Sequence, residues 1–417
     1  MSTRRTTTTV TTASPSVPFQ RQSDSGLLTD IFKAYYNARS NKRNTYSQVR
    51  FERNLSFNLF RLYTEVLERS YRPERSMCFI IRDPVQREVF AASFRDRIIH
   101  HYLYNQLEPV LEPTFIYDSY SCRKGKGTLF GIERLEHHIR SCSDNYHRQC
   151  FALKLDIEGY FMNMDRNRLF DMLLSRIDSL SSGGRLPSGF DYDTVLFLLR
   201  QVVFLDPTKG CRIKGQLSDW RGLPDSKSLF KSAPGCGLPI GNLTSQLFSN
   251  VYLNELDQYV KRNLGFRHYG RYVDDFYIID ESCDRLSAAV PLVADFLSSR
   301  LRLYLNYRKV KIIPVEEGIP FLGAVVSPDG RHLNRRSIRR IERRRMDSLC
   351  RESNPFALQA IMNSYSGYLE HFNTNLKVDV SWRSGCHWVS EAKSESVTAR
   401  SQRRYYSDSD GLRLFFS

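Results

Sequence analysis

Residues 151–157 read Phe-Ala-Leu-Lys-Leu-Asp-Ile, and residues 272–279 read Tyr-Val-Asp-Asp-Phe-Tyr-Ile-Ile. In the first stretch, large apolar side chains alternate with Ala152, Lys154 and Asp156, which is the period of a half-buried strand. In the second stretch, apolar runs flank Asp274 and Asp275, which predicts two strands joined by a tight turn. The sequence therefore predicts a sheet whose strands end in carboxylates.

Three carboxylates near strand ends suit hard divalent cations. Mg²⁺ prefers oxygen ligands, and it usually takes one or two carboxylates together with substrate phosphates. Two such ions would clamp the attacking and leaving oxygens of an in-line phosphoryl transfer. An Asp-Asp pair alone is more often a solvated turn, so the rest of the sequence has to decide between the two interpretations.

Length and composition exclude several classes of protein. The chain has 417 residues, a net charge of +16 and 41% hydrophobic residues, so a mostly disordered chain is excluded. No stretch approaches the roughly 20 apolar residues of a membrane span, and we expect no membrane partner. Nine cysteines without a C-x-x-C pair predict reduced thiols and a cytoplasmic location. The positive charge favours a polyanionic partner such as nucleic acid, with generic basicity as the alternative.

Hydrophobic periodicity places elements on both sides of the two stretches. The patterns predict helices over 27–71, 98–107, 166–176, 286–301 and 355–372, and strands over 78–81, 87–92, 310–315 and 320–326. Another helix is predicted to open just after Gly241, and seven arginines crowd a helix over 335–345. Residues 181–236, rich in Gly, Pro, Ser and Lys, indicate a loop-bearing insertion.

The two stretches resemble motifs of reverse transcriptases. Residues 272–275 are similar to the YxDD box of that family. Residues 155–161 resemble its first palm motif, in which an Asp is followed five residues later by an aromatic, here Phe161. Residues 240–246 read Ile-Gly-Asn-Leu-Thr-Ser-Gln, which looks like the variant box of enzymes from diversity-generating retroelements. The resemblance covers roughly residues 25–375.

The resemblance implies an α+β right-hand polymerase fold. Its expected parts are a basic tail (1–23), fingers (24–150), a palm of antiparallel sheet and helices (151–326, with the insertion at about 181–236), a helical thumb (327–375) and a C-terminal extension (376–417).

The resemblance also implies roles for individual residues. Catalysis would rest on Asp156, Asp274, Asp275 and Lys309, and the two Mg²⁺ ions, or Mn²⁺ in their place, would be held by the three aspartates and the Ile157 carbonyl. Nucleotide contacts would come from Arg87, Arg123, Lys124, Phe161 (as a steric gate), Ile240, Gly241 and Gln246. Nucleic acid would be contacted by Ser245, Arg339, Arg340, Arg343 and Arg344, although the arginine run also fits a merely solvated helix face.

The function implied is an RNA-directed DNA polymerase that makes error-prone, adenine-mutagenised cDNA from a template-repeat RNA and so diversifies a target gene. Expected partners are that RNA, the RNA–DNA hybrid, deoxynucleoside triphosphates and a pentameric basic accessory variability protein. The setting would be a bacterial, archaeal or phage-encoded cytoplasmic system. A group II intron or retron-type reverse transcriptase is the alternative within the class. A non-catalytic RNA-binding protein on a degenerate polymerase fold is the alternative outside it.

Overall fold

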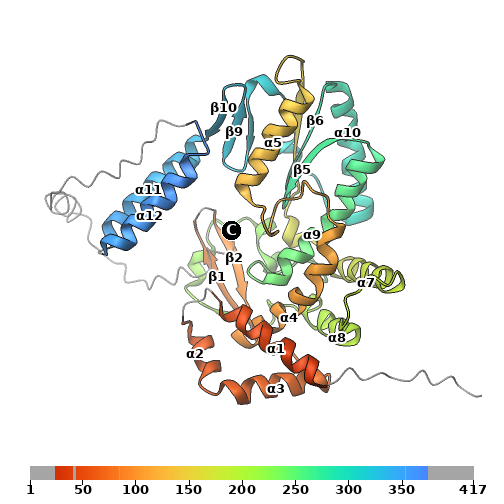
Figure 1. Ribbon diagram of the computed structural model, residues 1–417, viewed down its shortest axis with the longest axis vertical. Coiled ribbons are helices and arrows are strands. Elements are labelled where there is room, and N and C mark those ends of the chain that lie inside the picture. Colours follow the sequence, from red (N-terminus) through yellow and green to blue (C-terminus); the bar gives the residue numbers. More distant parts are fainter. Residues whose placement is uncertain (1–23, 41–43, 84, 353, 374–417) are drawn as a thin grey trace, which may run out of the picture.

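The computed structural model describes residues 24–40, 44–83, 85–352 and 354–373. Helices surround three small sheets in which all strand pairs but one are antiparallel, which confirms the predicted α+β class (Figure 1). The predicted tail at 1–23 and the extension at 376–417 lie outside the described residues.

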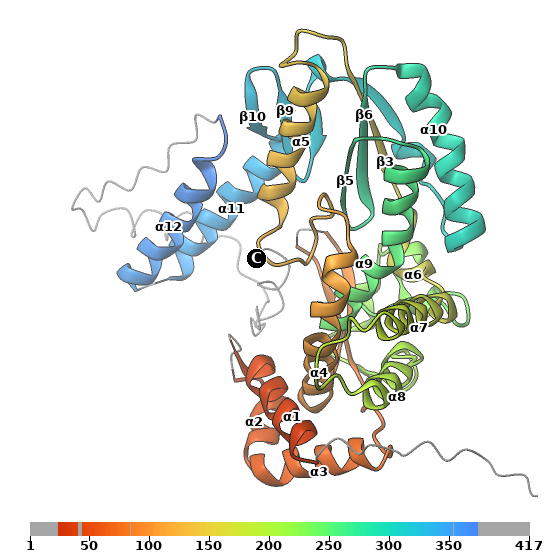
Figure 2. The same ribbon diagram turned by 45° about the vertical axis from the view of Figure 1, so that its right-hand side comes forward.

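The N-terminal part is helical and packs around one central helix. Helices α1 (Asp24–Arg39), α2 (Tyr46–Glu52) and α3 (Leu55–Leu67) pack with α4 (Phe94–Leu111) into the largest apolar core. Helix α4 starts after Ser93, whose hydroxyl accepts a hydrogen bond from the Asp96 amide, as expected of an N-cap serine. Helix α5 (Thr128–Cys142) follows a loop and lies beside another sheet (Figure 2).

A small sheet in the order β2-β1-β4 stands beside α4. Its strands are β1 (Met77–Ile81), β2 (Arg87–Ala91) and β4 (Arg212–Ile213). The register pairs Met77 with Ala91, Phe79 with Val89, and Ile81 with Arg87. Because directly opposite residues share one face of a sheet, these six side chains form one face. On the other face, Cys78 and Phe90 pack with Met162 and Leu229.

The insertion packs against this small sheet. After α6 (Tyr160–Asn163), α7 (Arg166–Ser182) and α8 (Tyr192–Val203), the chain forms β4 and three short helices, η2 (Leu217–Trp220), η3 (Asp225–Lys227) and η4 (Leu229–Lys231). The Glu88 carboxylate of β2 is buried and accepts from the Trp220 indole at 2.6 Å, the Ser228 hydroxyl at 3.0 Å and the Leu229 amide at 2.6 Å. One side chain thus ties the insertion to β2.

The central sheet has the order β5-β6-β3-β7. Its strands are β3 (Phe151–Asp156), β5 (His268–Tyr272), β6 (Asp275–Asp280) and β7 (Lys311–Pro314), all antiparallel. Leu153, Leu155, Phe276 and Ile278 face the core formed with α9 (Leu243–Gln258) and α10 (Cys283–Phe296). Ala152, Tyr277 and Ile279 face α5 and the second core. Both faces are therefore covered.

A third sheet, in the order β10-β9-β8, leads to the last helices. The predicted strand over 320–326 is divided into β8 (Ile319–Phe321) and β9 (Ala324–Ser327). The turn between them consists of Leu322 and Gly323, which both have positive φ. A strand requires negative φ, so the predicted single strand is interrupted at these two residues. Strand β10 (Gly330–Leu333) then precedes α11 (Arg335–Arg351) and α12 (Pro355–Leu369), which pack together (Figure 1).

Among the described residues, no helix has the length and apolarity needed to cross a membrane.

Replacing Glu88 with Ala should destabilise the protein. The change leaves the buried donors of Ser228 and Leu229 and the half-buried Trp220 indole without an acceptor, so we expect the free energy of unfolding to fall by about 3 kcal/mol. Chemical denaturation measures this fall, and limited proteolysis within 204–236 should accelerate. The matched control is Glu317→Ala, at an exposed position, which should change stability by less than about 0.5 kcal/mol. Equal stability of the two variants would contradict the role of Glu88.

Candidate active site

The three predicted aspartates meet at one end of the central sheet. Asp156, the last residue of β3, lies directly opposite Asp275, the first residue of β6. Tyr272 of β5 is also opposite Asp275, so Val273 and Asp274 form the turn between β5 and β6. Because opposite residues in an antiparallel pair share a face, Asp156 and Asp275 project to the same side.

Burial and the neighbouring charges disfavour the charged forms of the Asp274 and Asp275 carboxylates. Burial, and next the negative charge of Asp156, raise the pKa of Asp274 to about 6. Burial also raises the pKa of Asp275, although the nearby Lys154 ammonium opposes that change. The site therefore concentrates negative charge that a cation would stabilise.

Two lysines bind two of the three carboxylates. Lys309, in η7 (Tyr307–Lys309), lies with its Nζ 2.8 Å from Asp156 Oδ2. Burial, the largest effect, lowers the pKa of Lys309, but the hydrogen bond to Asp156 and the negative charges of the three aspartates together outweigh it, so the pKa is raised. Lys154 Nζ lies 2.6 Å from Asp275 Oδ1 and 4.6 Å from the centre of the Phe321 ring. The structure thus brings Lys309 to the aspartates as predicted, and adds Lys154.

The donor chemistry of the site fits Mg²⁺. Carboxylate oxygens are the ligands that this ion prefers, and three of them come from adjacent strand ends. The described part of the chain nevertheless contains no group of three His, Cys, Asp or Glu side chains already arranged to hold a metal ion. The Ile157 side chain is buried and its backbone forms a bridge with Leu305, so its carbonyl as a ligand stays a prediction.

Gly241 permits a close approach between the start of α9 and strand β2. Its φ is +119°, and a Cβ there would lie 2.8 Å from Val89 Cγ1 and 3.3 Å from the Phe90 carbonyl oxygen. The Phe90 amide also donates to the Ile240 carbonyl at 3.0 Å. The close approach in this structure is thus to β2, whereas the sequence suggested an approach to a base pair.

The aromatic and helix-start residues differ in exposure. Phe161 is half-buried between the main core and the cluster of Cys78 and Phe90, and Ile240 packs against the same cluster. Ser245 is buried in α9, whereas Gln246 is half-buried. Phe161 and Ile240 therefore lie at the junction of the small sheet and the central sheet, and the Ser245 side chain faces the protein interior.

The predicted basic residues occupy three different environments. Arg87 is exposed on β2. Burial raises the pKa of the Tyr272 hydroxyl to about 12, and the positive charge of Arg87 slightly opposes this rise, so Arg87 lies on the side of the small sheet nearer the aspartate turn. The buried Arg123 guanidinium binds Glu112 at 2.7 Å and the carbonyls of Ile116 and Ser119. In this structure the contacts of Arg123 hold its own loop, and its contact with a nucleotide stays a prediction.

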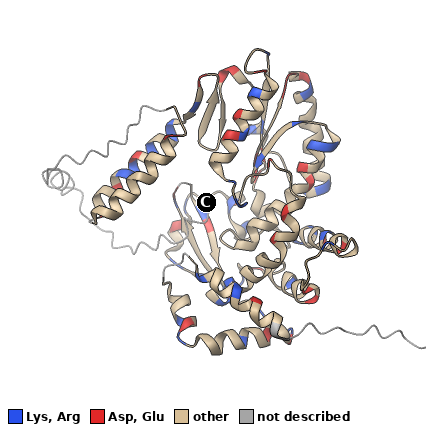
Figure 3. Ribbon diagram, in the orientation of Figure 1, with Lys and Arg blue, Asp and Glu red and all other residues tan. Residues whose placement is uncertain are grey.

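Lys124 and the helix α11 arginines also have protein partners. Lys124 is exposed and lies 3.1 Å from Glu108. Arg343 and Arg344 approach Asp83, at the tip of the β1–β2 hairpin, at 3.3 and 2.8 Å. The remaining two of the predicted set are the exposed Arg339 and the half-buried Arg340, and Figure 3 shows the cationic residues of this helix pair.

No protein-family model matches this chain. It is similar to Protein YkfC of Escherichia coli (strain K12), with 24% identity over 263 residues that make up 55% of this chain and 60% of that protein. Among solved structures, it is similar to telomerase from Candida albicans in complex with a TWJ fragment of telomeric RNA, with 13% identity, a TM-score of 0.42, and coverage of 72% of this chain and 53% of the telomerase chain. The corresponding complex from Candida tropicalis gives 12% identity, a TM-score of 0.45, and coverage of 72% and 54%. This chain thus spans 60% of the curated relative and little more than half of these telomerase chains.

A basic groove that the sequence patterns did not reveal lies beside the small sheet. It has a volume near 1110 Å³ and is walled by α2, α3, β1, the end of β2 and β4. Two glutamates line it against eight cationic residues, Arg50, Arg61, Arg72, Arg75, Arg95, Arg97, Arg212 and Lys214. Its floor includes Met77, Phe79 and Ala91, which share the sheet face of Val89 and Arg87. One face of the small sheet therefore extends from the groove to Arg87, the residue of β2 nearest the aspartate turn of the central sheet. These cations are scattered from residue 50 to residue 214, so only the fold assembles them.

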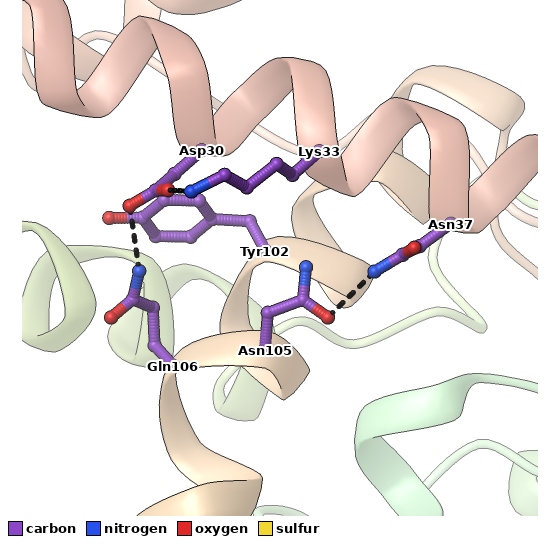
Figure 4. Close-up of a pocket in the computed structure, with 6 residues that line it drawn as sticks. All are labelled: Asp30, Lys33, Asn37, Tyr102, Asn105 and Gln106. Carbon is purple, nitrogen blue, oxygen red and sulfur yellow. Dashed lines mark hydrogen bonds and ion pairs between the residues drawn. The ribbon is translucent and has the colours of Figure 1, made fainter.

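A second pocket, between α1 and α4, has no comparable chemistry. Its polar side chains bind one another: Lys33 to Asp30 at 3.0 Å, Gln106 to Asp30 at 3.1 Å and Asn37 to Asn105 at 3.0 Å (Figure 4). These contacts satisfy the groups that a ligand would need, so we interpret this pocket as part of the helix packing.

Proposed function

We propose that this chain is a reverse transcriptase, an RNA-directed DNA polymerase, with Asp156, Asp274 and Asp275 at its active site. The observation that carries the proposal is the strand register, which sets Asp156 opposite Asp275 and puts Asp274 in the adjoining turn. In this proposal α1–α5 and the β1–β2 hairpin are the fingers, the central sheet is the palm, and α11 and α12 are the thumb.

The residues of the site support nucleotide addition to a 3′ end. Asp156, Asp274 and Asp275, with the Ile157 carbonyl, would hold Mg²⁺, which supplies charge stabilisation for the attacking and leaving oxygens. Lys309, whose ammonium lies 2.8 Å from Asp156, would neutralise the leaving pyrophosphate. Arg87, on strand β2 of the small sheet, would bind the triphosphate oxygens.

The junction of the two sheets would select the nucleotide. Phe161 follows Asp156 by five residues and lies half-buried at this junction, where an aromatic face would exclude a 2′-hydroxyl. The basic groove supports binding of the template strand, because its cations would contact phosphates while Tyr46 and Phe79 offer aromatic faces for unpaired bases. The α11 arginines would contact the hybrid backbone in the same sequence-independent way.

The finer proposal is a reverse transcriptase of a diversity-generating retroelement, which copies a template-repeat RNA with errors at adenines. The box at 240–246, with Ile240 where an amide is usual, supports this assignment over a group II intron or retron-type enzyme. Expected partners are the template RNA, deoxynucleoside triphosphates and a pentameric basic accessory protein. Deep sequencing of cDNA made on the cognate RNA separates these candidates, because only the retroelement enzyme should mutate mainly at adenines.

Replacing Asp274 with Asn should abolish polymerisation. In a primer-extension assay with an RNA template and Mg²⁺, we expect kcat to fall by at least about a thousandfold, since a ligand of the ion is lost. The matched control, Asp295→Asn on the exposed surface of α10, should extend as the wild type does. RNA binding without extension by the wild-type chain would instead favour the non-catalytic alternative.

Neutralising the basic groove should weaken template binding without changing the chemistry. Arg75→Ala combined with Arg212→Ala removes two exposed groove cations, so the slope of log Kd against log salt should fall by about 1 to 2. Fluorescence anisotropy with single-stranded RNA measures this slope. Arg262→Ala combined with Arg300→Ala makes the same change in charge outside the groove, and an equal effect of both pairs would refute a specific groove.

Replacing Ile240 with Gln should raise fidelity at template adenines. The added amide can form a hydrogen bond near the incoming nucleotide, and we expect misincorporation opposite adenine to fall by about tenfold, the equivalent of one hydrogen bond. Sequencing of the cDNA products counts the errors, and Ile240→Leu is the apolar control. An error spectrum that is the same for Gln and Leu would exclude a role for Ile240 in fidelity.

A further inference from the structure

The turn that carries Asp274 has a strained backbone. Val273 has a φ of 56°, in the left-handed region, where a β-branched residue is rare because its Cβ crowds the backbone. Such a residue costs on the order of 1–3 kcal/mol and persists only where its surroundings impose it. Some contact outside the turn must therefore hold Val273 in this conformation.

Arg271, two residues before Val273, provides this contact. Its Nη1 donates to the Val273 carbonyl at 3.1 Å, so the guanidinium binds the strained peptide directly. Its backbone is fixed independently, because its amide donates to the Asp118 carbonyl at 2.9 Å and its carbonyl accepts from the Tyr120 amide at 2.9 Å. The arginine thus connects a fixed strand to the turn.

The guanidinium is itself held by Asp257 of α9. Arg271 Nε and Nη2 donate to the two carboxylate oxygens of Asp257 at 2.7 and 2.6 Å. Both side chains are almost completely buried, and Asp257 also accepts from the Tyr269 hydroxyl at 2.7 Å. A bidentate pair of this kind fixes both the position and the plane of the guanidinium.

A stabilising role alone explains this pair poorly. Burying two charges removes their hydration, and apolar residues of similar volume are often equally stable or more stable. What apolar residues cannot do is donate to the Val273 carbonyl while keeping a fixed orientation. The orientation that Asp257 gives to the Arg271 guanidinium therefore explains this pair better than a contribution to the free energy of unfolding does.

We propose that Arg271 is a positioning residue, which uses the Asp257 carboxylate of α9 as an anchor to fix the Val273–Asp274 turn for catalysis. The catalytic part of this inference rests on the proposed function. Helix α9 begins at the 240–246 box and ends at this anchor, so it links that box to the orientation of Asp274. A lysine cannot replace the arginine, because one ammonium lacks the planar fork that reaches both Asp257 and the turn.

Two variants of the full-length chain test the proposal. Arg271→Met combined with Asp257→Leu removes the pair without leaving an unpaired charge, and Arg271→Lys keeps the charge without the fork. For both, we expect faster hydrogen exchange in peptides spanning 269–278 of the metal-free protein. We also expect kcat for primer extension to fall by about 100-fold, with the nucleotide KM and the primer–template Kd within about twofold of wild type.

The control is Arg331→Met combined with Glu136→Leu, which removes a partly buried ion pair between β10 and α5, 3.1 Å long, outside the site. The second partners of this pair, Glu133 and Arg140, are solvent-exposed side chains that water can solvate after the change. It should leave exchange at 269–278 and kcat unchanged. Wild-type exchange in a folded Arg271→Lys chain overturns the proposal, even if the double variant does not fold. If the wild-type chain does not extend a primer, the proposed function fails, and hydrogen exchange alone decides whether Arg271 positions the turn.

Discussion

The like charges of Asp156 and Asp275 lie opposite each other at the end of the β3–β6 strand pair, and the surrounding structure has to hold them there. The β3–β6 register cannot place Leu153, Leu155, Phe276 and Ile278 in the core without also bringing Asp156 and Asp275 face to face. A slip of one residue would separate the carboxylates, but it would also turn the apolar side chains to the opposite face. The hydrophobic effect therefore holds the acidic residues in a proximity that their mutual repulsion opposes.

The surroundings compensate for this repulsion in a graded way. Lys309 and Lys154 each neutralise one carboxylate, and Asp274, without such a lysine contact described, has the pKa raised to about 6. Lys154 comes from the same strand as Asp156, two residues earlier, so it lies on the same face. Lys154 can therefore occupy a covered face of the central sheet, because its ammonium neutralises the Asp275 carboxylate and contacts the Phe321 ring.

The sequence predicted those parts of the site that depend on neighbours along the chain. Alternation of apolar residues located β3, and apolar runs on either side of Asp274 and Asp275 located β5 and β6. The family resemblance pointed to Asp156, Asp274, Asp275 and Lys309, which the fold assembles. The sequence did not predict that the Arg123 guanidinium binds groups of its own loop. Glu112 and the backbone carbonyls that bind it carry no distinctive sequence pattern. The basic groove and the Asp257 anchor were also missed, since each joins residues far apart in sequence, and a buried Arg–Asp pair looks like any two surface charges until the fold is known.

The contact between Asp83 and α11 closes a circuit of packed elements. The circuit runs from the central sheet through α9 to β2, along the β1–β2 hairpin to Asp83, across to Arg343 and Arg344, and back through β9 and α5 to the sheet. The other joints combine apolar packing and backbone pairing with partly or fully buried ion pairs, such as Arg271–Asp257 between the central sheet and α9, whereas this one is a partly exposed ion pair of the kind that contributes about 1 kcal/mol or less. Among the described residues, this contact is a weak link of the circuit, and a thermal fluctuation can separate the hairpin tip from α11 at a low cost in free energy.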